Sequence, residues 1–123
     1  MLATSTPAWF EIPAVDLDRA RRFYETVTGA ELRVQEMGPM TMAIFPYEHP
    51  STSGALLKAD GAEPTTSGSV VYLHVDDIRP ALARAEAAGG QTLLPLTALP
   101  NDGGVFAQIR DSEGNRVGLY SRR

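Results

Sequence analysis

Residues 9–32 read WFEIPAVDLDRARRFYETVTGAEL, and residues 70–93 read VVYLHVDDIRPALARAEAAGGQTL. At a constant offset of 61 positions, Asp16 aligns with Asp77 and Gly29 aligns with Gly90. Aspartate is a preferred N-cap of a helix, and glycine commonly ends one, so each pair marks the same helix in both stretches. We interpret the two stretches as copies of one duplicated unit.

Each copy predicts one opening strand, one helix and three further strands. Aromatic and branched residues at 9–12 and 70–75 are typical of strands. Both helices carry apolar residues at steps of three and four, with charged residues off that stripe. Three more strands are expected in each copy, at 31–36, 40–45 and 54–58, and at 91–94, 105–110 and 116–120. The sequence therefore predicts an α+β fold of two βαβββ modules.

The expected domain organisation is a single domain over residues 1–123. Module 1 covers about 8–58 and module 2 about 70–121, with a linker at 59–69 that is rich in glycine, proline and threonine. A second loop is expected at 95–104, long enough to cover a pocket or reach a partner. The total of 123 residues is the size of one ordinary domain.

Composition excludes several classes of function. The chain has no cysteine, which rules out disulfide scaffolds, thiolate zinc sites and cysteine nucleophiles. A net charge of -4 argues against nucleic acid or an anionic membrane as the partner. No apolar run approaches the roughly 20 residues of a membrane span. The polar segment 1–7 lacks the features of an export signal, so a cytoplasmic location is expected.

Three motifs carry a resemblance to a known family. They are VDLDRA at 15–20, VDDI at 75–78 and DSEGNRV at 111–117. Together they resemble the vicinal-oxygen-chelate superfamily, which includes glyoxalase I, extradiol dioxygenases, fosfomycin-resistance enzymes and bleomycin-resistance proteins. The third motif is similar to the family's Asp-Pro-Asp-Gly-Asn turn. The resemblance implies a curved mixed sheet of two half-barrels around a cleft, and commonly a homodimer.

The positions where this family holds a metal carry no ligand here. The resemblance implies a histidine on the first strand, a histidine on the strand that opens module 2 and a glutamate on the last strand. Counting seven residues from the capping aspartates and from Asp111 places Trp9, Val70 and Gly118 at these positions. None of the three side chains can ligate a metal. We expect no standard metal site and no cofactor.

Strand alternation suggests which other residues line the cleft. Side chains two apart share a face, so Glu11 accompanies Trp9, and Tyr72 and His74 accompany Val70. On the strand at 105–110, one face presents Phe106, Gln108 and Arg110, and the sequence does not decide whether it points inward. The candidate ligand-binding residues are Trp9, Glu11, Tyr72, His74, Phe106 and Gln108. They favour a metal-independent, glyoxalase- or bleomycin-resistance-like protein that binds a small planar or cationic organic molecule.

Several alternatives stay open at this point. Glu11 and His74 could transfer a proton as the catalytic pair of a glyoxalase-type lyase or isomerase, or they could simply satisfy each other or the backbone. Trp9 could stack on a ligand, or it could anchor the core or a dimer interface. A combination of His49 and His74 with Glu11 has the composition of an iron triad, although no spacing motif supports it. A further possible function is that of an accessory protein whose cleft is filled by its own side chains.

Overall fold

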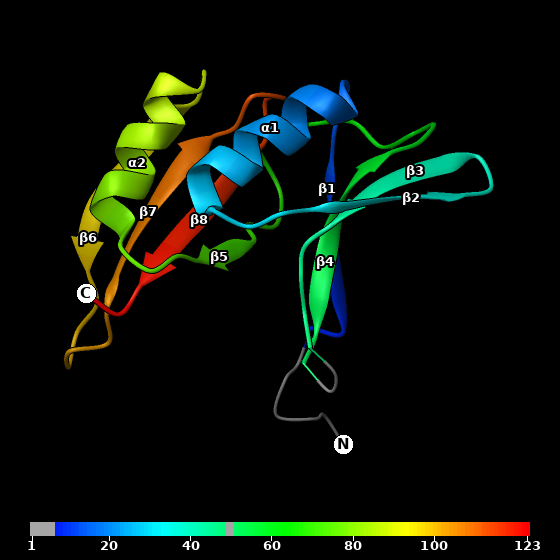
Figure 1. The fold of residues 1–123 in the computed structure, drawn as a ribbon. Coiled ribbons are helices and arrows are strands. Elements are labelled where there is room, and N and C mark those ends of the chain that lie inside the picture. Colours follow the sequence, from blue (N-terminus) through cyan, green and yellow to red (C-terminus); the bar gives the residue numbers. More distant parts are fainter. Residues whose placement is uncertain (1–6, 49–50) are drawn as a thin grey trace.

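The computed structural model describes residues 7–48 and 51–123 (Figure 1). Within these ranges the chain forms two helices and eight strands in the predicted order. The elements are β1 (Trp9–Pro13), α1 (Leu17–Thr28), β2 (Arg33–Met37), β3 (Met40–Ile44), β4 (Ser53–Lys58), β5 (Tyr72–His74), α2 (Ile78–Ala87), β6 (Gln91–Ala98), β7 (Val105–Arg110) and β8 (Arg116–Ser121). The order βαβββ–βαβββ confirms the α+β fold expected from the sequence.

Each module builds its own four-stranded mixed sheet. Sheet A has the strand order β1-β4-β3-β2, and sheet B has the order β5-β8-β7-β6. The opening strand of each module pairs in parallel with the last strand, whereas the other neighbours are antiparallel. Both sheets therefore share one topology, as a duplicated sequence predicts.

Both helices begin at the capping residues that the repeat predicts. The Asp16 carboxylate accepts a hydrogen bond from the Arg19 amide at 3.0 Å, and Asp77 accepts from the Arg79 amide at 3.1 Å. Gly29 ends α1 in the left-handed conformation, with φ of 75°. In module 2 the pair Gly89-Gly90 is the predicted stop, and Gly89, one position before the residue that aligns with Gly29, has the positive φ of 101°. At Gly90 a side chain would instead collide with the Arg110 carbonyl and the Phe23 ring.

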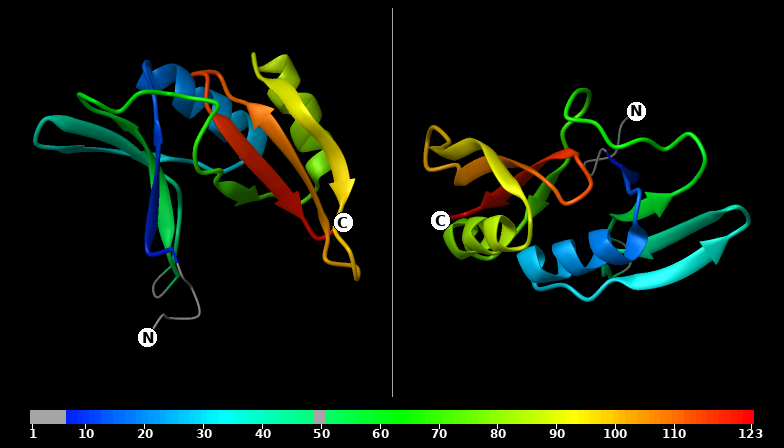
Figure 2. Two further views of the ribbon diagram at one scale, coloured as in Figure 1. Left: turned by 180° about the vertical axis from the view of Figure 1, so that it is seen from behind. Right: turned by 90° about the horizontal axis from the view of Figure 1, so that it is seen from above.

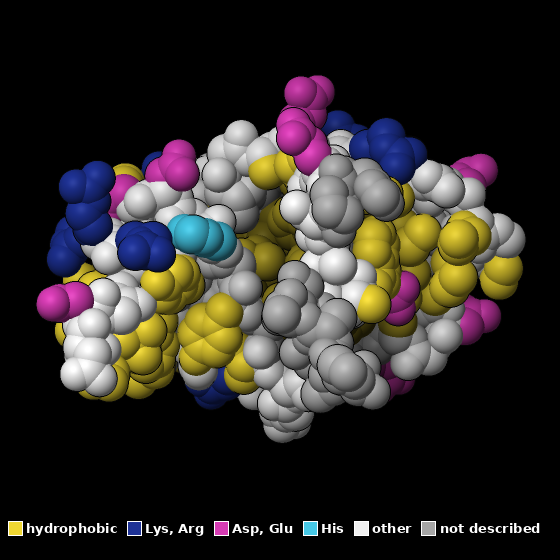
Figure 3. Space-filling model, turned by 90° about the horizontal axis from the view of Figure 1, so that it is seen from below, with side chains coloured by type: hydrophobic (Ala, Val, Ile, Leu, Met, Phe, Trp, Pro, Cys, Tyr) yellow, Lys and Arg dark blue, Asp and Glu magenta, His cyan; other side chains and the backbone are white. Residues whose placement is uncertain are grey.

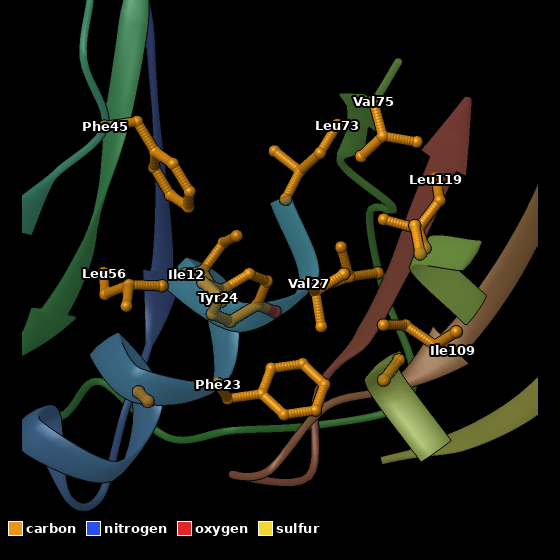
Figure 4. Packing of buried hydrophobic residues seen from close by; sticks show 14 of the residues in the cluster. Ile12, Phe23, Tyr24, Val27, Phe45, Leu56, Leu73, Val75, Ile109 and Leu119 are labelled. Carbon is orange, nitrogen blue, oxygen red and sulfur yellow. The ribbon is translucent and has the colours of Figure 1, made fainter. Parts of the chain in front are cut away.

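One hydrophobic core joins the two modules. Ile12, Phe45 and Leu56 reach it from sheet A, and Leu73, Val75, Ile109 and Leu119 reach it from sheet B (Figure 4). Phe23, Tyr24 and Val27 of α1 fill the space between the sheets. The helices contact each other at this junction (Figure 2). The core-facing side of each sheet is thus directed toward the other module.

The second module also contacts the first through polar groups. The Tyr24 hydroxyl on α1 donates to the buried Asp111 carboxylate, which begins the turn between β7 and β8. The Glu113 carboxylate of that turn accepts from the Val15 and Asp16 amides and from the Arg19 guanidinium. The turn therefore holds the start of α1.

Two strands of module 2 differ from the sequence prediction. β5 is shorter than the expected 70–75, and β6 extends to Ala98, so the second loop covers only 99–104. Pro95 is compatible with this longer strand because β6 lies at the edge of sheet B and its register shifts on both sides of Leu94. No helix within the described ranges is long and apolar enough to cross a membrane.

Candidate functional site

Each sheet has a second face that points away from the shared core. Because side chains alternate along a strand, Ile12 enters the core while Trp9 and Glu11 lie on the opposite side of sheet A. In the same way Leu73 enters the core while Tyr72 and His74 are exposed on sheet B. Figure 3 shows apolar side chains at the surface toward both ends of the molecule.

The outer face of sheet B carries a hollow of about 250 Å³, which we call the aromatic hollow. Tyr72 of β5, Phe106 of β7, Tyr120 of β8 and Leu99 line it. The Tyr72 and Phe106 rings meet edge to face, with centroids 5.9 Å apart. Ala107 and Ile109 of β7 are buried in the core, so the face of β7 with Phe106 and Gln108 is the one that looks outward.

A chain of hydrogen bonds fixes the Tyr72 ring at the edge of this hollow. Arg116 Nη1 donates to Gln108 Oε1 at 2.9 Å, and Gln108 Nε2 donates to the Tyr72 hydroxyl at 2.7 Å. The Arg116 guanidinium also donates through Nε to the Thr66 carbonyl of the linker. Because a guanidinium can only donate, the amide oxygen of Gln108 must face Arg116 and its nitrogen must face Tyr72.

The loop 99–104 follows β6, and its first residue, Leu99, lines one side of the aromatic hollow. The Leu99 amide donates to the Gly104 carbonyl, and the Tyr120 hydroxyl donates to the Gly103 carbonyl at 2.7 Å. Asn101 and Asp102 adopt left-handed conformations, with φ of 58° and 55°. These residue types tolerate that conformation better than most, so the sequence of the loop fits its tight shape. That the loop covers a pocket or reaches a partner stays a prediction.

The outer face of sheet A carries a separate hollow of about 270 Å³. Its lining includes Trp9, Glu11, Met37, Met40, Met42 and Tyr47. Several of these side chains are exposed: Trp9 by 40%, Met37 by 48% and Tyr47 by 52%. Trp9 is therefore not a core residue in this chain. The structure brings Tyr72, Phe106 and Gln108 together but holds Trp9 and Glu11 on the other sheet.

Glu11 and His74 do not interact within the described chain. No hydrogen bond or ion pair joins them among residues 7–48 and 51–123, and they belong to different sheets. The His74 imidazole packs edge to face on the Tyr120 ring, with centroids 5.3 Å apart. Glu11 also borders a hollow of about 300 Å³ that is lined in part by linker residues between 65 and 69. His49, the third member of the iron combination considered above, lies outside the described residues.

The three positions implied for a metal do not fit one. Trp9 and Val70 have no donor atom for a metal, and Gly118 has no side chain. Gly118 pairs with Tyr72 across β8 and β5, and a Cβ added there would collide with the Tyr72 ring. Within the described ranges no group of three or more histidines or carboxylates is placed to hold a metal ion.

Sequence reasoning missed three residues of this site: Leu99, Arg116 and Tyr120. Tyr120 shares a strand face with Arg116 and Gly118, so alternation along β8 could have found it once the outward face was known. The same alternation could have found Arg116, but not its hydrogen bond to Gln108, because that contact depends on the pairing of β7 with β8. The position of Leu99 depends on the path of a loop, which the sequence does not determine.

A family model confirms the resemblance noted in the sequence. Residues 6–119 match the model described as the Glyoxalase/Bleomycin resistance protein/Dioxygenase superfamily. The chain therefore belongs to this superfamily. A curated relative, a glyoxylase-like domain-containing protein from Didymella fabae, is 28% identical over 122 residues, covering 91% of this chain and 90% of the relative.

Solved structures of the superfamily have the same fold. A mutant of glyoxalase I from Zea mays matches with a TM-score of 0.72 and 22% identity over 95% of this chain. This chain covers 46% of that protein, so it spans less than half of its length. TnmS3, an antibiotic binding protein from Streptomyces sp. CB03234, matches with a TM-score of 0.72 and 24% identity, covering 98% of both chains. Identities this low show the fold alone.

Proposed function

We propose that this protein binds a small, planar, largely apolar organic molecule in the aromatic hollow, without a resident metal. The observation that carries the proposal is the lining of that hollow by three aromatic rings and Leu99. Aromatic walls favour flat ligands, because rings stack or meet edge to face with other rings. A dry cavity of about 150 Å³ accommodates a benzene ring, so about 250 Å³ suits one substituted ring or a small bicycle.

The similarity to an antibiotic binding protein supports binding without chemistry. TnmS3 is similar to this chain over nearly its whole length. The residues at the implied metal positions also speak against metal-assisted catalysis, since Tyr72 occupies the space of a side chain at position 118. Binding without a metal therefore needs fewer assumptions than a reaction that depends on a metal at the three implied positions.

Binding can be tested with two matched leucine variants. A panel of planar aromatic compounds, from indole to flavone, is titrated into the protein and followed by NMR. Leu99→Ala should weaken the bound compounds about tenfold, because it removes apolar contact at the hollow. Leu96→Ala is the control, since Leu96 is equally exposed on the same sheet but does not line the hollow. Equal affinities for the two variants would contradict the proposal.

The alternative remains proton transfer by Glu11 and His74 in a lyase or isomerase. Because the two side chains do not meet within the described chain, this mechanism requires another copy of the chain or a large rearrangement. Mass spectrometry of the recovered ligand separates the two functions. Ligand recovered unchanged supports binding, whereas turnover that is lost in both Glu11→Gln and His74→Asn supports catalysis. Metal content well below one ion per chain would support the metal-independent form of either function.

We also propose that the chain is a homodimer in which the hollow on sheet A is covered by a second copy. The support is the exposure of Trp9, Met37 and Tyr47 around a shared hollow, because exposed apolar groups of this kind often mark interfaces. Trp9→Gln should shift sedimentation toward the monomer. Val15→Gln is the control, since Val15 is exposed by 60% but lies outside that hollow. A monomeric wild-type protein would contradict this proposal.

A further inference from the structure

The outward face of sheet A carries a row of four residues with opposite charges at its two ends. Glu11 of β1 pairs with Ala55 of β4, which pairs with Ile44 of β3. Ile44 in turn pairs with Arg33 of β2. Residues that pair across strands share a face of the sheet, and Ala55 and Ile44 belong to a small apolar cluster separate from the shared core. We call these four residues the charged row.

Both ends of the charged row line the hollow on sheet A. Glu11 and Arg33 are among its lining residues, and both are exposed. The lining and the strand register therefore agree in placing the two side chains on one face. The aromatic hollow differs in this respect, because its lining is aromatic and apolar. The hollow on sheet A thus has an acidic group at one edge and a basic group at the other.

The described part of the chain neutralises neither of these charges. Within residues 7–48 and 51–123 neither Glu11 nor Arg33 forms an ion pair. Arg33 Nη1 donates to Gln35 Oε1 at 2.8 Å, and Gln35 lines the same hollow. This bond orients the guanidinium and leaves its other N–H groups available to a carboxylate. Three strand spacings of about 4.8 Å place the backbones of Glu11 and Arg33 about 14 Å apart, so a ligand has room between the two charges.

The surface between the two charges suits a flat apolar body. Ile44 and Met42 line the hollow and are buried in the middle of the sheet face. Trp9 lies two residues before Glu11 on the same side of β1, and it is exposed by 40% at the hollow. An indole stacks readily on another ring, and flexible thioethers adapt to the shape of their neighbours. The charged row therefore combines two separated charges with an apolar floor.

We infer that the hollow on sheet A binds a flat zwitterion, with its ammonium group at Glu11 and its carboxylate at Arg33. The inference goes beyond the function proposed for the aromatic hollow, because it concerns a second site and a different class of ligand. A single ring with charged groups at opposite ends suits a hollow of about 270 Å³. A second copy over this hollow would enclose the ligand, and the exclusion of water would strengthen both charge contacts.

The zwitterionic probe is 4-(aminomethyl)benzoic acid, and two analogues each carry one of its charges. The first analogue, 4-methylbenzoic acid, keeps the carboxylate, and the second, benzylamine, keeps the ammonium group. Trp9 is the only tryptophan of the chain and lines the hollow, so its fluorescence reports the dissociation constant of each probe. The zwitterion should bind about three- to fivefold more tightly than either analogue, as expected for one additional exposed ion pair.

Two substitutions that remove one charge each should affect the probes in a crossed pattern. Glu11→Gln should weaken the zwitterion and benzylamine about three- to fivefold and leave 4-methylbenzoate unchanged. Arg33→Gln should weaken the zwitterion and 4-methylbenzoate by a similar factor and leave benzylamine unchanged. The matched controls are Glu36→Gln and Lys58→Gln, because Glu36 and Lys58 align through Thr41 on the opposite face of the same sheet. These two variants should leave all three constants unchanged.

The crossed pattern also separates this inference from the proposals made above. Leu99→Ala should leave the three constants unchanged, and a loss in this variant would place the probes in the aromatic hollow and overturn the inference. Loss of a dimer would weaken all three probes alike, so equal losses in Glu11→Gln and Arg33→Gln overturn it as well. A zwitterion that binds no more tightly than its analogues has the same meaning. Binding of planar apolar compounds in the aromatic hollow is decided independently of these outcomes by its own titrations.

Discussion

The Tyr24 hydroxyl on α1 donates a hydrogen bond of 2.5 Å to Asp111 Oδ2, at the turn between β7 and β8. Both side chains are buried, and they belong to different modules. Asp111 also accepts from the backbone amides of Glu113, Gly114 and Asn115 through its other oxygen. A single carboxylate therefore both shapes a turn of module 2 and binds the helix of module 1.

Tyr24→Phe should lower the free energy of unfolding by about 1.5–3 kcal/mol, because it removes a buried hydrogen bond to a charged group. Chemical denaturation measures this loss. Tyr47→Phe is the control, since Tyr47 is exposed by 52%. Burial, followed by the neighbouring Asp111, raises the pKa of Tyr24 well above its ordinary value of 10.0. The native state thus keeps a proton that the unfolded chain releases, so wild-type stability should fall as the pH rises above about 10. Equal free energies of unfolding for Tyr24→Phe and Tyr47→Phe would show that the hydrogen bond does not stabilise the native state.

Glu113→Gln should weaken the dependence of stability on acid pH. Burial is the largest single influence on the Glu113 carboxyl, and it raises the pKa. The hydrogen bonds from Arg19, Asp16 and Ser112, together with the charge of Arg19, outweigh burial and lower the pKa below 4.5. A carboxyl with a lowered pKa stabilises the native state above its unfolded pKa and loses this effect as the pH falls. Wild-type stability should therefore decline below about pH 4.5. Denaturation curves from pH 7 to pH 3 for Glu113→Gln and the exposed control Glu63→Gln test this, and parallel curves for the wild type and Glu113→Gln would contradict it.

Arg84→Met should destabilise the contact between the two helices by about 1 kcal/mol. Arg84 of α2 donates from Nε to the Thr26 carbonyl and from Nη2 to the Val27 carbonyl, both at 2.8 Å. These carbonyls belong to the last turn of α1, where a positive charge is favourable. The control is Arg22→Met, because Arg22 makes no side-chain hydrogen bond among the described residues. An equal, near-zero effect of both variants on the denaturation midpoint would show that the Arg84 contact is not stabilising.

Gly118→Ala should displace the Tyr72 ring, since a Cβ at this position would overlap it. The expected loss is about 1–3 kcal/mol of stability, as for other overpacked sites. Binding of planar aromatic compounds in the aromatic hollow should weaken as well, because the Tyr72 ring lines that hollow. In a Tyr72→Ala background the same substitution should have little effect on the denaturation midpoint. Equal losses in the two backgrounds would rule out the predicted collision.

The local parts of this fold follow directly from the sequence. Asp16 and Asp77 identify the helix starts, and alternation along β5 and β7 correctly groups Tyr72 with His74 and Phe106 with Gln108. The relative position of the two sheets does not follow, because it depends on packing between residues far apart in the chain. This is why Trp9 and Tyr72, expected in one cleft, occupy separate hollows of the chain.

The polar contacts between modules were equally inaccessible to sequence reasoning. Arg19 and Glu113 are 94 positions apart, and no spacing rule connects them. Gln108 and Tyr72 were both candidates for the site, yet their hydrogen bond depends on β8 lying between β5 and β7. The sequence thus indicates which residues face outward on a strand, and the topology determines which of them become neighbours.

The ring of Tyr72 over Gly118 also constrains how a protein of this kind can evolve. A carboxylate on the last strand cannot arise there by a single substitution, because the aromatic ring already fills that space. The bulky residue would have to be replaced first, and with it the phenol that completes the hollow. A side chain at position 118 and the present position of the Tyr72 ring are therefore incompatible, so a metal ligand at that position would require the ring to move or be replaced.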